Sequence, residues 1–226
     1  DTHHSPTRLP YQDRHPIDAI DKINKMIDET KFIDLDFMVE IGDLCDSNTN
    51  VDLITILDVI KTHPVKEKLY VTGNHDYGLK SDWLTATNLP RGYYSKIING
   101  FKIIVLDMFD DGNGEGNQPS RYGMDAPQIE WLHGQMNSGD EKILIFSHLK
   151  ESDIVGFNLT TFLNGYRDKV IGVFSGHKHL EDFQLISGVN HYNLDALTDG
   201  AYPIGLYYIF EIDENNNVSY TVHGES

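Results

Sequence analysis

The chain has 226 residues, of which 39% are hydrophobic, so it is long enough to bury a substantial core in one large domain or two small ones. Its 35 acidic and 18 basic residues give a formal net charge of −17, which argues against general binding to a nucleic-acid backbone or to an anionic membrane surface. No apolar run approaches the length of a membrane span, and no signal peptide is visible. A single cysteine, Cys45, excludes an intrachain disulfide, and we therefore expect a reducing, cytoplasmic location.

The chain begins with an Asp-Thr-His tripeptide, which places a carboxylate on Asp1 and an imidazole on His3. By themselves these residues could be polar N-terminal residues without a function, and only the motifs that follow favour a role as metal ligands. Residues 4–15 then form a loop that contains prolines, histidines and arginines. Arg8 and Arg14 are candidate contacts for a phosphate or a ribose, and the alternative is that both lie in a solvated loop.

Helices and strands alternate in the next part of the chain. Pro16 opens a helix with an apolar stripe that predicts a core face, namely Ile17, Ile20, Ile23 and Ile27. A strand is expected over residues 36–41, and a helix over 51–61 has an apolar inner face, namely Leu53, Ile54, Leu57 and Ile60. A further apolar strand ends at Asn74. This alternation predicts parallel strands joined by right-handed crossovers.

The pattern changes after Asp76. A short helix is predicted around Trp83, and a hairpin is predicted to turn at Asn99-Gly100. The long polar segment 107–123 is either a lid or an insertion. Asp125 is positioned to cap a helix. The remaining predicted elements are strands over 142–146, 169–174, 183–186, 190–194, 204–212 and 218–222, and a short helix over 159–163.

Metal-capable side chains follow four of these strands at the point where each strand ends. They are Asp43 after Gly42, the run Asn74-His75-Asp76 after Gly73, His148 after Ser147, and the pair His177 and His179 after Gly176. In open α/β folds the ligand crevice lies at the carboxyl ends of the strands, so we expect these side chains to meet at one edge. Imidazole, carboxylate and amide oxygen suit Mn, Fe or Zn, whereas the lack of cysteines in these clusters excludes a thiolate zinc site.

Taken in order, the clusters D-x-H, G-D, G-N-H-D, H and G-H-x-H resemble the calcineurin-like metallophosphoesterase superfamily over nearly the whole chain. The resemblance implies an α/β fold, a four-layer α/β/β/α sandwich with two mixed β-sheets flanked by helices. We expect one such domain over residues 1–226. In that family a buried strand precedes D-x-H, so we also expect that an N-terminal strand before Asp1 has been clipped from the sequence.

The resemblance also implies a role for each motif residue. One metal ion is bound by Asp1, His3 and His179, the other by Asn74, His148 and His177, and Asp43 bridges the two. A hydroxide between the metals attacks phosphorus in line. His75 does not bind metal; it stabilises the phosphoryl oxygens or protonates the leaving group, and Asp76 orients it.

Weaker motifs bear on the substrate. Segments around Leu106-Asp107, Trp131-Leu132 and Ser147-His148 resemble the branch with class III cyclic-nucleotide phosphodiesterases and Mn-dependent ADP-ribose/CDP-alcohol diphosphatases. We therefore predict hydrolysis of a small phosphodiester or nucleotide-type substrate, with Tyr202 as a candidate contact. The alternatives are a phosphomonoesterase or protein phosphatase, and a catalytically inactive binding scaffold, which the filled motif positions disfavour.

Overall fold

The structure, a computed structural model, describes residues 1–47, 49–110 and 122–224. Most of the predicted lid-or-insertion segment, residues 111–121, lies outside the described residues. Within the described ranges, no helix is both long and apolar enough to cross a membrane.

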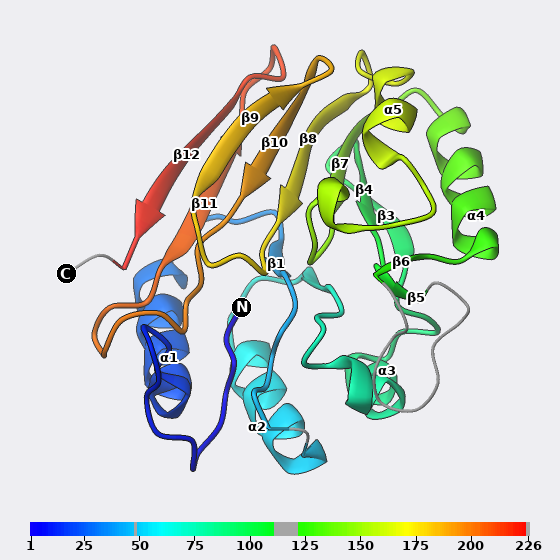
Figure 1. Cartoon of the computed structure of the whole chain (residues 1–226). Helices are drawn as coiled ribbons and strands as arrows, with labels where there is room; N and C mark the ends of the chain where they lie inside the picture. Colours follow the sequence, from blue (N-terminus) through cyan, green and yellow to red (C-terminus); the bar gives the residue numbers. More distant parts are fainter. Residues whose placement is uncertain (48, 111–121, 225–226) are drawn as a thin grey trace.

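A six-stranded mixed sheet forms one half of the molecule (Figure 1). In spatial order its strands are β3 (Tyr94–Ile98), β4 (Phe101–Val105), β7 (Lys142–Phe146), β8 (Val170–Ser175), β10 (Val189–Asn193) and β9 (Asp182–Ile186). The four central strands run parallel, and the edge strands β3 and β9 pair antiparallel with their neighbours. The predicted turn joins β3 to β4, with Asn99 and Gly100 at φ angles of 47° and 82°.

Two short parallel strands and a β-ribbon face the six-stranded sheet. They are β1 (Met38–Glu40) paired with β2 (Lys68–Tyr70), and β11 (Tyr207–Ile212) paired with β12 (Val218–His223). An apolar core that includes Leu144, Phe146, Phe174 and Tyr192 fills the space between the layers. A further pair, β5 (Phe109–Asp110) and β6 (Gly123–Met124), lies beside β3 and β4 (Figure 1).

Helices cover both outer faces and complete the predicted four layers. They are α1 (Ala19–Thr30), α2 (Asn50–Lys61), α3 (Lys80–Thr87), α4 (Ala126–Asn137) and α5 (Leu159–Asn164). Residues of α4 and α5 form a second apolar core on the outer face of the six-stranded sheet. Residues of α1, α2 and α3 form a third apolar core with Leu44 and Tyr70. The Asp125 carboxylate accepts a hydrogen bond from the Gln128 backbone N–H, as the capping prediction requires.

Two predicted core positions are wrong. Ile17 is 44% exposed because it lies in a 3₁₀ turn, Pro16–Asp18, before α1 begins at Ala19. Ile54 is also 44% exposed, whereas Ile56 is fully buried. At 100° per residue, Ile56 shares the face of the other buried residues of α2, and Ile54 is turned away from it.

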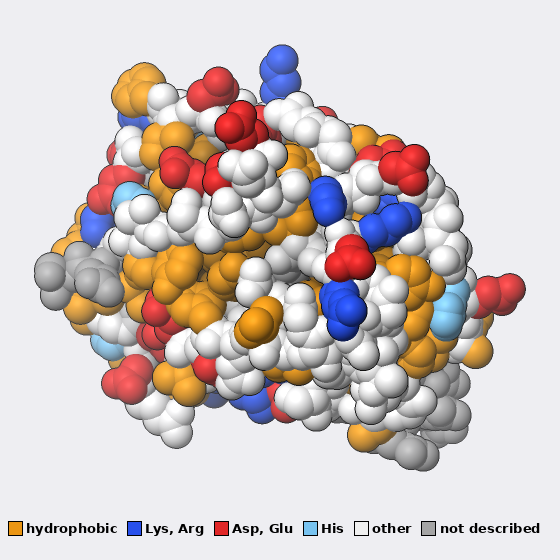
Figure 2. Space-filling view, turned by 90° about the horizontal axis from the view of Figure 1, so that it is seen from above, with side chains coloured by type: hydrophobic (Ala, Val, Ile, Leu, Met, Phe, Trp, Pro, Cys, Tyr) orange, Lys and Arg blue, Asp and Glu red, His pale blue; other side chains and the backbone are white. Residues whose placement is uncertain are grey.

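An apolar groove of about 500 Å³ lies between β1 and β11. The described residues pair β1 only with β2, and β11 only with β12, so one edge of each strand faces the groove. Its walls include Val39, Phe101 and Phe210, and Asp1 lines it as well. Seen from above, hydrophobic side chains gather in a hollow on that face of the molecule (Figure 2). The expectation of a strand before Asp1 stays a prediction.

Candidate metal centre

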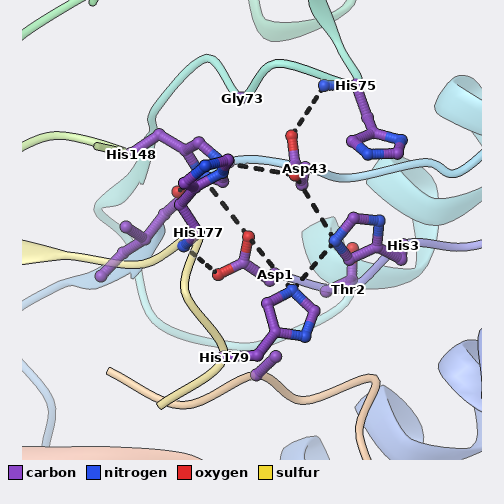
Figure 3. Close-up of polar contacts among 12 residues, drawn as sticks. Asp1, Thr2, His3, Asp43, Gly73, His75, His148, His177 and His179 are labelled. Carbon is purple, nitrogen blue, oxygen red and sulfur yellow. Dashed lines mark hydrogen bonds and ion pairs between the residues drawn. The ribbon is translucent and has the colours of Figure 1, made fainter. Parts of the chain in front are cut away.

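The predicted motif residues converge where β1, β2, β7 and β8 end (Figure 3). The exit loops of β1 and β2 approach each other so closely that a Cβ on Gly73 would lie 2.0 Å from the Asp43 backbone nitrogen. Residue 42 has a left-handed φ of 94°, a conformation that favours glycine. The turn at Gly42 directs Asp43 towards the exit loop of β2. The Asp43 Oδ1 atom accepts a hydrogen bond of 2.8 Å from the His75 backbone N–H. The two exit loops are therefore tied together through Asp43.

Asp1, His3 and His179 form the first cluster, in which their ligand atoms lie within 4.8 Å of one another. The Nε2 atoms of His3 and His179 are 3.2 Å apart, and His179 Nε2 lies 4.0 Å from Asp1 Oδ1. Asp43 Oδ2 is 3.4 Å from His3 Nε2, so Asp43 borders this cluster. The structure thus brings together the side chains predicted for one metal ion.

Asp43, His148 and His177 form the second cluster. His148 Nε2 lies 3.3 Å from Asp43 Oδ2 and 3.2 Å from His177 Nδ1. The Asn74 amide oxygen is 3.1 Å from the same His148 nitrogen. Asp43 Oδ2 therefore faces both clusters, which is the position predicted for a bridging ligand.

The donor set fits cations. His148 Nδ1 lies 2.7 Å from the Ile41 carbonyl oxygen, and His179 Nδ1 lies 2.9 Å from Asp199 Oδ1, so each Nδ1 is the protonated nitrogen. In its neutral form, each ring presents an Nε2 lone pair to another imidazole nitrogen at 3.2 Å. Asp1 Oδ1 is also buried without a hydrogen-bond partner. Lone pairs that converge in this way match the carboxylate–histidine–metal arrangement.

The protonation states also suit metal binding. Burial lowers the pKa of both His3 and His177 to about 4, so their rings are neutral near pH 7. Burial lowers the pKa of His148, but the charge of Asp43 and the hydrogen bond to it raise that pKa further, so the net shift is upward. Burial alone would favour a neutral Asp43 carboxyl, but the charge and hydrogen bond of the protonated His148, and then His3, outweigh it, so the pKa of Asp43 is held below its usual range. An ionised carboxylate and neutral imidazoles are the ligand forms of these groups, so His148 gives up its proton when it binds a metal ion.

The predicted orientation of His75 by Asp76 is wrong. The Asp76 carboxylate accepts hydrogen bonds of 3.0 Å from the backbone N–H groups of Leu44 and Gly73, and so braces the two exit loops. Asp46 faces the imidazole instead, with Oδ1 3.1 Å from His75 Nδ1. Burial lowers the pKa of His75, but the hydrogen bond to Asp46 and the charges of Asp43 and Asp46 raise it further, so the net shift is upward.

His75 also lies within 4.8 Å of ligand atoms of His3 and Asp43. Its Nδ1 is engaged by Asp46, and 30% of the side chain is exposed. The exposure gives a substrate access to the imidazole, as a proton donor requires. The role predicted for His75, without metal binding, stays a prediction.

The candidate substrate residues have different surroundings. Arg8 pairs with Asp46 at 2.6 Å and stacks over the Tyr11 ring, 4.2 Å from its centroid. Arg14 donates to the Tyr11 hydroxyl at 3.2 Å. Tyr202 is 52% exposed and its backbone N–H donates to Asp18. Arg8 is therefore linked to the centre through Asp46, and Arg14 is linked through Tyr11, whose hydroxyl donates to Asp46 at 3.1 Å. No described contact joins Tyr202 to the centre.

A comparison with known protein families matches residues 1–181 to the calcineurin-like phosphoesterases. The chain belongs to this family. Among solved structures, the chain is similar to a dimetal phosphatase from Danio rerio, with a TM-score of 0.68 and 16% sequence identity. The alignment covers 88% of this chain and 86% of the Danio rerio chain. A purple acid phosphatase from yellow lupin aligns with 83% of this chain over 41% of its own length, with a TM-score of 0.53 and 16% sequence identity. At these identities the likeness shows the fold alone. A search of curated proteins found no significant match.

Membership makes this phosphoesterase a metal-dependent hydrolase, and the two clusters offer candidate ligands for a dimetal centre. Two residues of the centre, Asp46 and Asp199, were missed in the sequence. Asp46 follows Asp43 by three residues, and this G-D-x-x-D spacing was an available signal. Asp199 reaches His179 from the segment between β10 and β11, and no spacing in the sequence indicates that contact.

Proposed function

We propose that this phosphoesterase hydrolyses small phosphodiester or nucleotide-type substrates at a two-metal centre. One observation carries the proposal: Asp43 Oδ2 faces His3 Nε2 at 3.4 Å and His148 Nε2 at 3.3 Å, so one carboxylate oxygen is shared by two ligand clusters. Two adjacent metal ions supply a nucleophile at neutral pH and neutralise charge on the phosphoryl group.

The chain's own residues divide the remaining work. Asp1, His3 and His179 hold one metal ion, and Asn74, His148 and His177 hold the other. His75, kept in place by Asp46, donates a proton to the leaving-group oxygen or a hydrogen bond to the phosphoryl oxygens. An upward-shifted pKa supports this assignment, because a general acid must be protonated when the substrate binds.

The charge near the centre supports a diester over a monoester. A phosphodiester carries one negative charge at pH 7, whereas a monoester carries nearly two. Arg8 is already paired with Asp46, whose side chain is fully buried, so this arginine brings little net charge to a substrate. The net charge of −17 likewise favours a small substrate over a nucleic acid.

The test compares bis-p-nitrophenyl phosphate with p-nitrophenyl phosphate, on metal-stripped protein restored with Mn²⁺. We expect faster turnover of the diester. Faster turnover of the monoester would move this protein to the phosphatase alternative. Two bound metals with no turnover of either compound would contradict hydrolysis of simple esters and support the binding-scaffold alternative.

A further inference from the structure

A buried lysine clamps the segment that carries Asp199. Lys22 lies on α1 and only 2% of it is exposed. Its Nζ atom donates to three consecutive carbonyl oxygens, those of Thr198 at 2.6 Å, Asp199 at 3.1 Å and Gly200 at 2.6 Å. An ammonium group has three N–H donors, so every donor has an acceptor. This is the condition under which a buried charge is tolerated.

The clamp stabilises the backbone shape of residues 198–200. Three successive carbonyl dipoles point at one spot, and they repel one another unless a cation lies between them. Gly200 adopts a φ of 72°, which lets the chain turn there. The lysine stem has little freedom, because a Cβ on Gly205 would lie 3.1 Å from three of its carbons. The ammonium therefore holds residues 198–200 together with the loop before α1, where the His15 N–H donates to the Thr198 carbonyl at 2.9 Å and the Asp13 carbonyl accepts from the Gly200 N–H at 2.8 Å.

The clamped segment contacts two members of the first cluster. Asp199 accepts a hydrogen bond from His179 Nδ1, at 2.9 Å to Oδ1 and 3.1 Å to Oδ2. The Thr198 backbone N–H donates to the Asp1 carbonyl oxygen at 3.2 Å. A shift of this segment would turn the His179 ring and move Asp1 together. The second cluster is linked to the clamped segment only indirectly, because the His177 backbone N–H donates to Asp1 Oδ2 at 2.9 Å, while the His148 ring is oriented by the Ile41 carbonyl.

We propose that Lys22 is a positioning residue for the metal ion held by Asp1, His3 and His179, and not for the ion held by His148 and His177. It acts through Asp199, which orients His179. This proposal rests on the proposed two-metal centre. Loss of such an outer partner typically weakens metal binding about 10- to 100-fold.

The experiment measures Mn²⁺ binding to the metal-stripped full chain by equilibrium dialysis. We expect K22M to keep one Mn²⁺ site unchanged and to weaken the other about 10- to 100-fold. The matched control is K25M on the same helix, since Lys25 donates to the Pro203 carbonyl but lies nearer the surface. K25M should bind both ions as the wild type does.

Two backgrounds identify the affected site. The H148A background keeps only the Mn²⁺ site of His3 and His179, and adding K22M to it should weaken Mn²⁺ binding at that site. The H179A background keeps only the Mn²⁺ site of His148 and His177, and adding K22M to it should leave the affinity of that site unchanged. Because Lys22 acts through Asp199, K22M added to D199N should cost little more than D199N alone.

Equal weakening of both sites by K22M, or an effect that adds fully to that of D199N, would overturn the proposal and indicate a general loss of structure. Should K22M fail to fold, K22Q provides a milder comparison, because its neutral amide keeps two N–H donors but removes the charge and reaches less far. Wild-type protein with fewer than two Mn²⁺ sites would refute the two-metal centre itself. Two wild-type sites that K22M leaves intact would refute only the role of Lys22.

Discussion

The partner of His75 decides how the proton donor is held, and a pair of variants tests it. In D46N the carboxylate becomes an amide of the same size, 3.1 Å from His75 Nδ1. A hydrogen bond to a charged group contributes about 1.5–3 kcal/mol, and a neutral one about 0.5–1.5 kcal/mol. The difference of about 1–2 kcal/mol corresponds to a roughly 5- to 30-fold lower kcat.

The assay is hydrolysis of bis-p-nitrophenyl phosphate at saturating Mn²⁺, because Asp46 Oδ1 also lies 3.4 Å from His3 Nδ1 and its loss affects metal binding. The alkaline limb of the pH–rate profile should move to lower pH in D46N, since the charge that raises the pKa of His75 is gone.

D76N is the matched comparison. Asp76 is fully buried and accepts two backbone N–H groups, so an amide nitrogen there leaves one donor unpaired. We expect D76N to lower the free energy of unfolding by about 1–3 kcal/mol and to change kcat only a few-fold. A larger loss of kcat in D76N than in D46N would refute the assignment of Asp46 and restore Asp76 as the partner of His75.

Three further predictions concern the centre and its surroundings. H75A should bind two Mn²⁺ ions and lose about 10²–10⁴-fold in turnover; loss of metal would show that His75 is a ligand. D43N should lose both ions, and retention of two in a dialysis assay would count against bridging. Burial raises the pKa of Glu40 from 4.5 to about 7, so the folded state binds the extra proton between these pH values and the free energy of unfolding falls as pH rises through that range. By urea unfolding in EDTA, the free energy of unfolding of E40Q should exceed that of the wild type by about 3 kcal/mol at pH 8 and match it at pH 4; equal curves at pH 8 would contradict a buried charge there.

Periodicity and turn residues predicted most elements of the fold. The helix around Trp83 and the hairpin at Asn99-Gly100 are confirmed, because their signals are local in the chain. The order of the six strands was not predictable, since it depends on which apolar faces pack together. The four-layer arrangement came from the motif resemblance and is confirmed.

The candidate centre also contains residues that the sequence predicted and residues that it did not. Residues at strand ends, such as Asp43 and His148, were placed correctly because parallel strands end at a common edge. Asp76 was assigned wrongly because neighbours in sequence do not face each other at a tight turn. Its side chain turns back to the backbone, and the carboxylate that meets His75 comes from the preceding strand's exit loop.

The groove beside β11 has a consequence for hydrogen exchange. A two-stranded ribbon alone is marginally stable in water, and β11–β12 is hydrogen-bonded to no other strand within the described part of the chain. Its attachment depends on aromatic packing, such as that of Phe210 against Phe174 with ring centroids 4.9 Å apart. The amides of β11 and β12 should therefore exchange before those of β7 and β8. None of the residues assigned to the metal centre lies on the ribbon, so a local opening of β11 and β12 would break none of the contacts described within the two clusters.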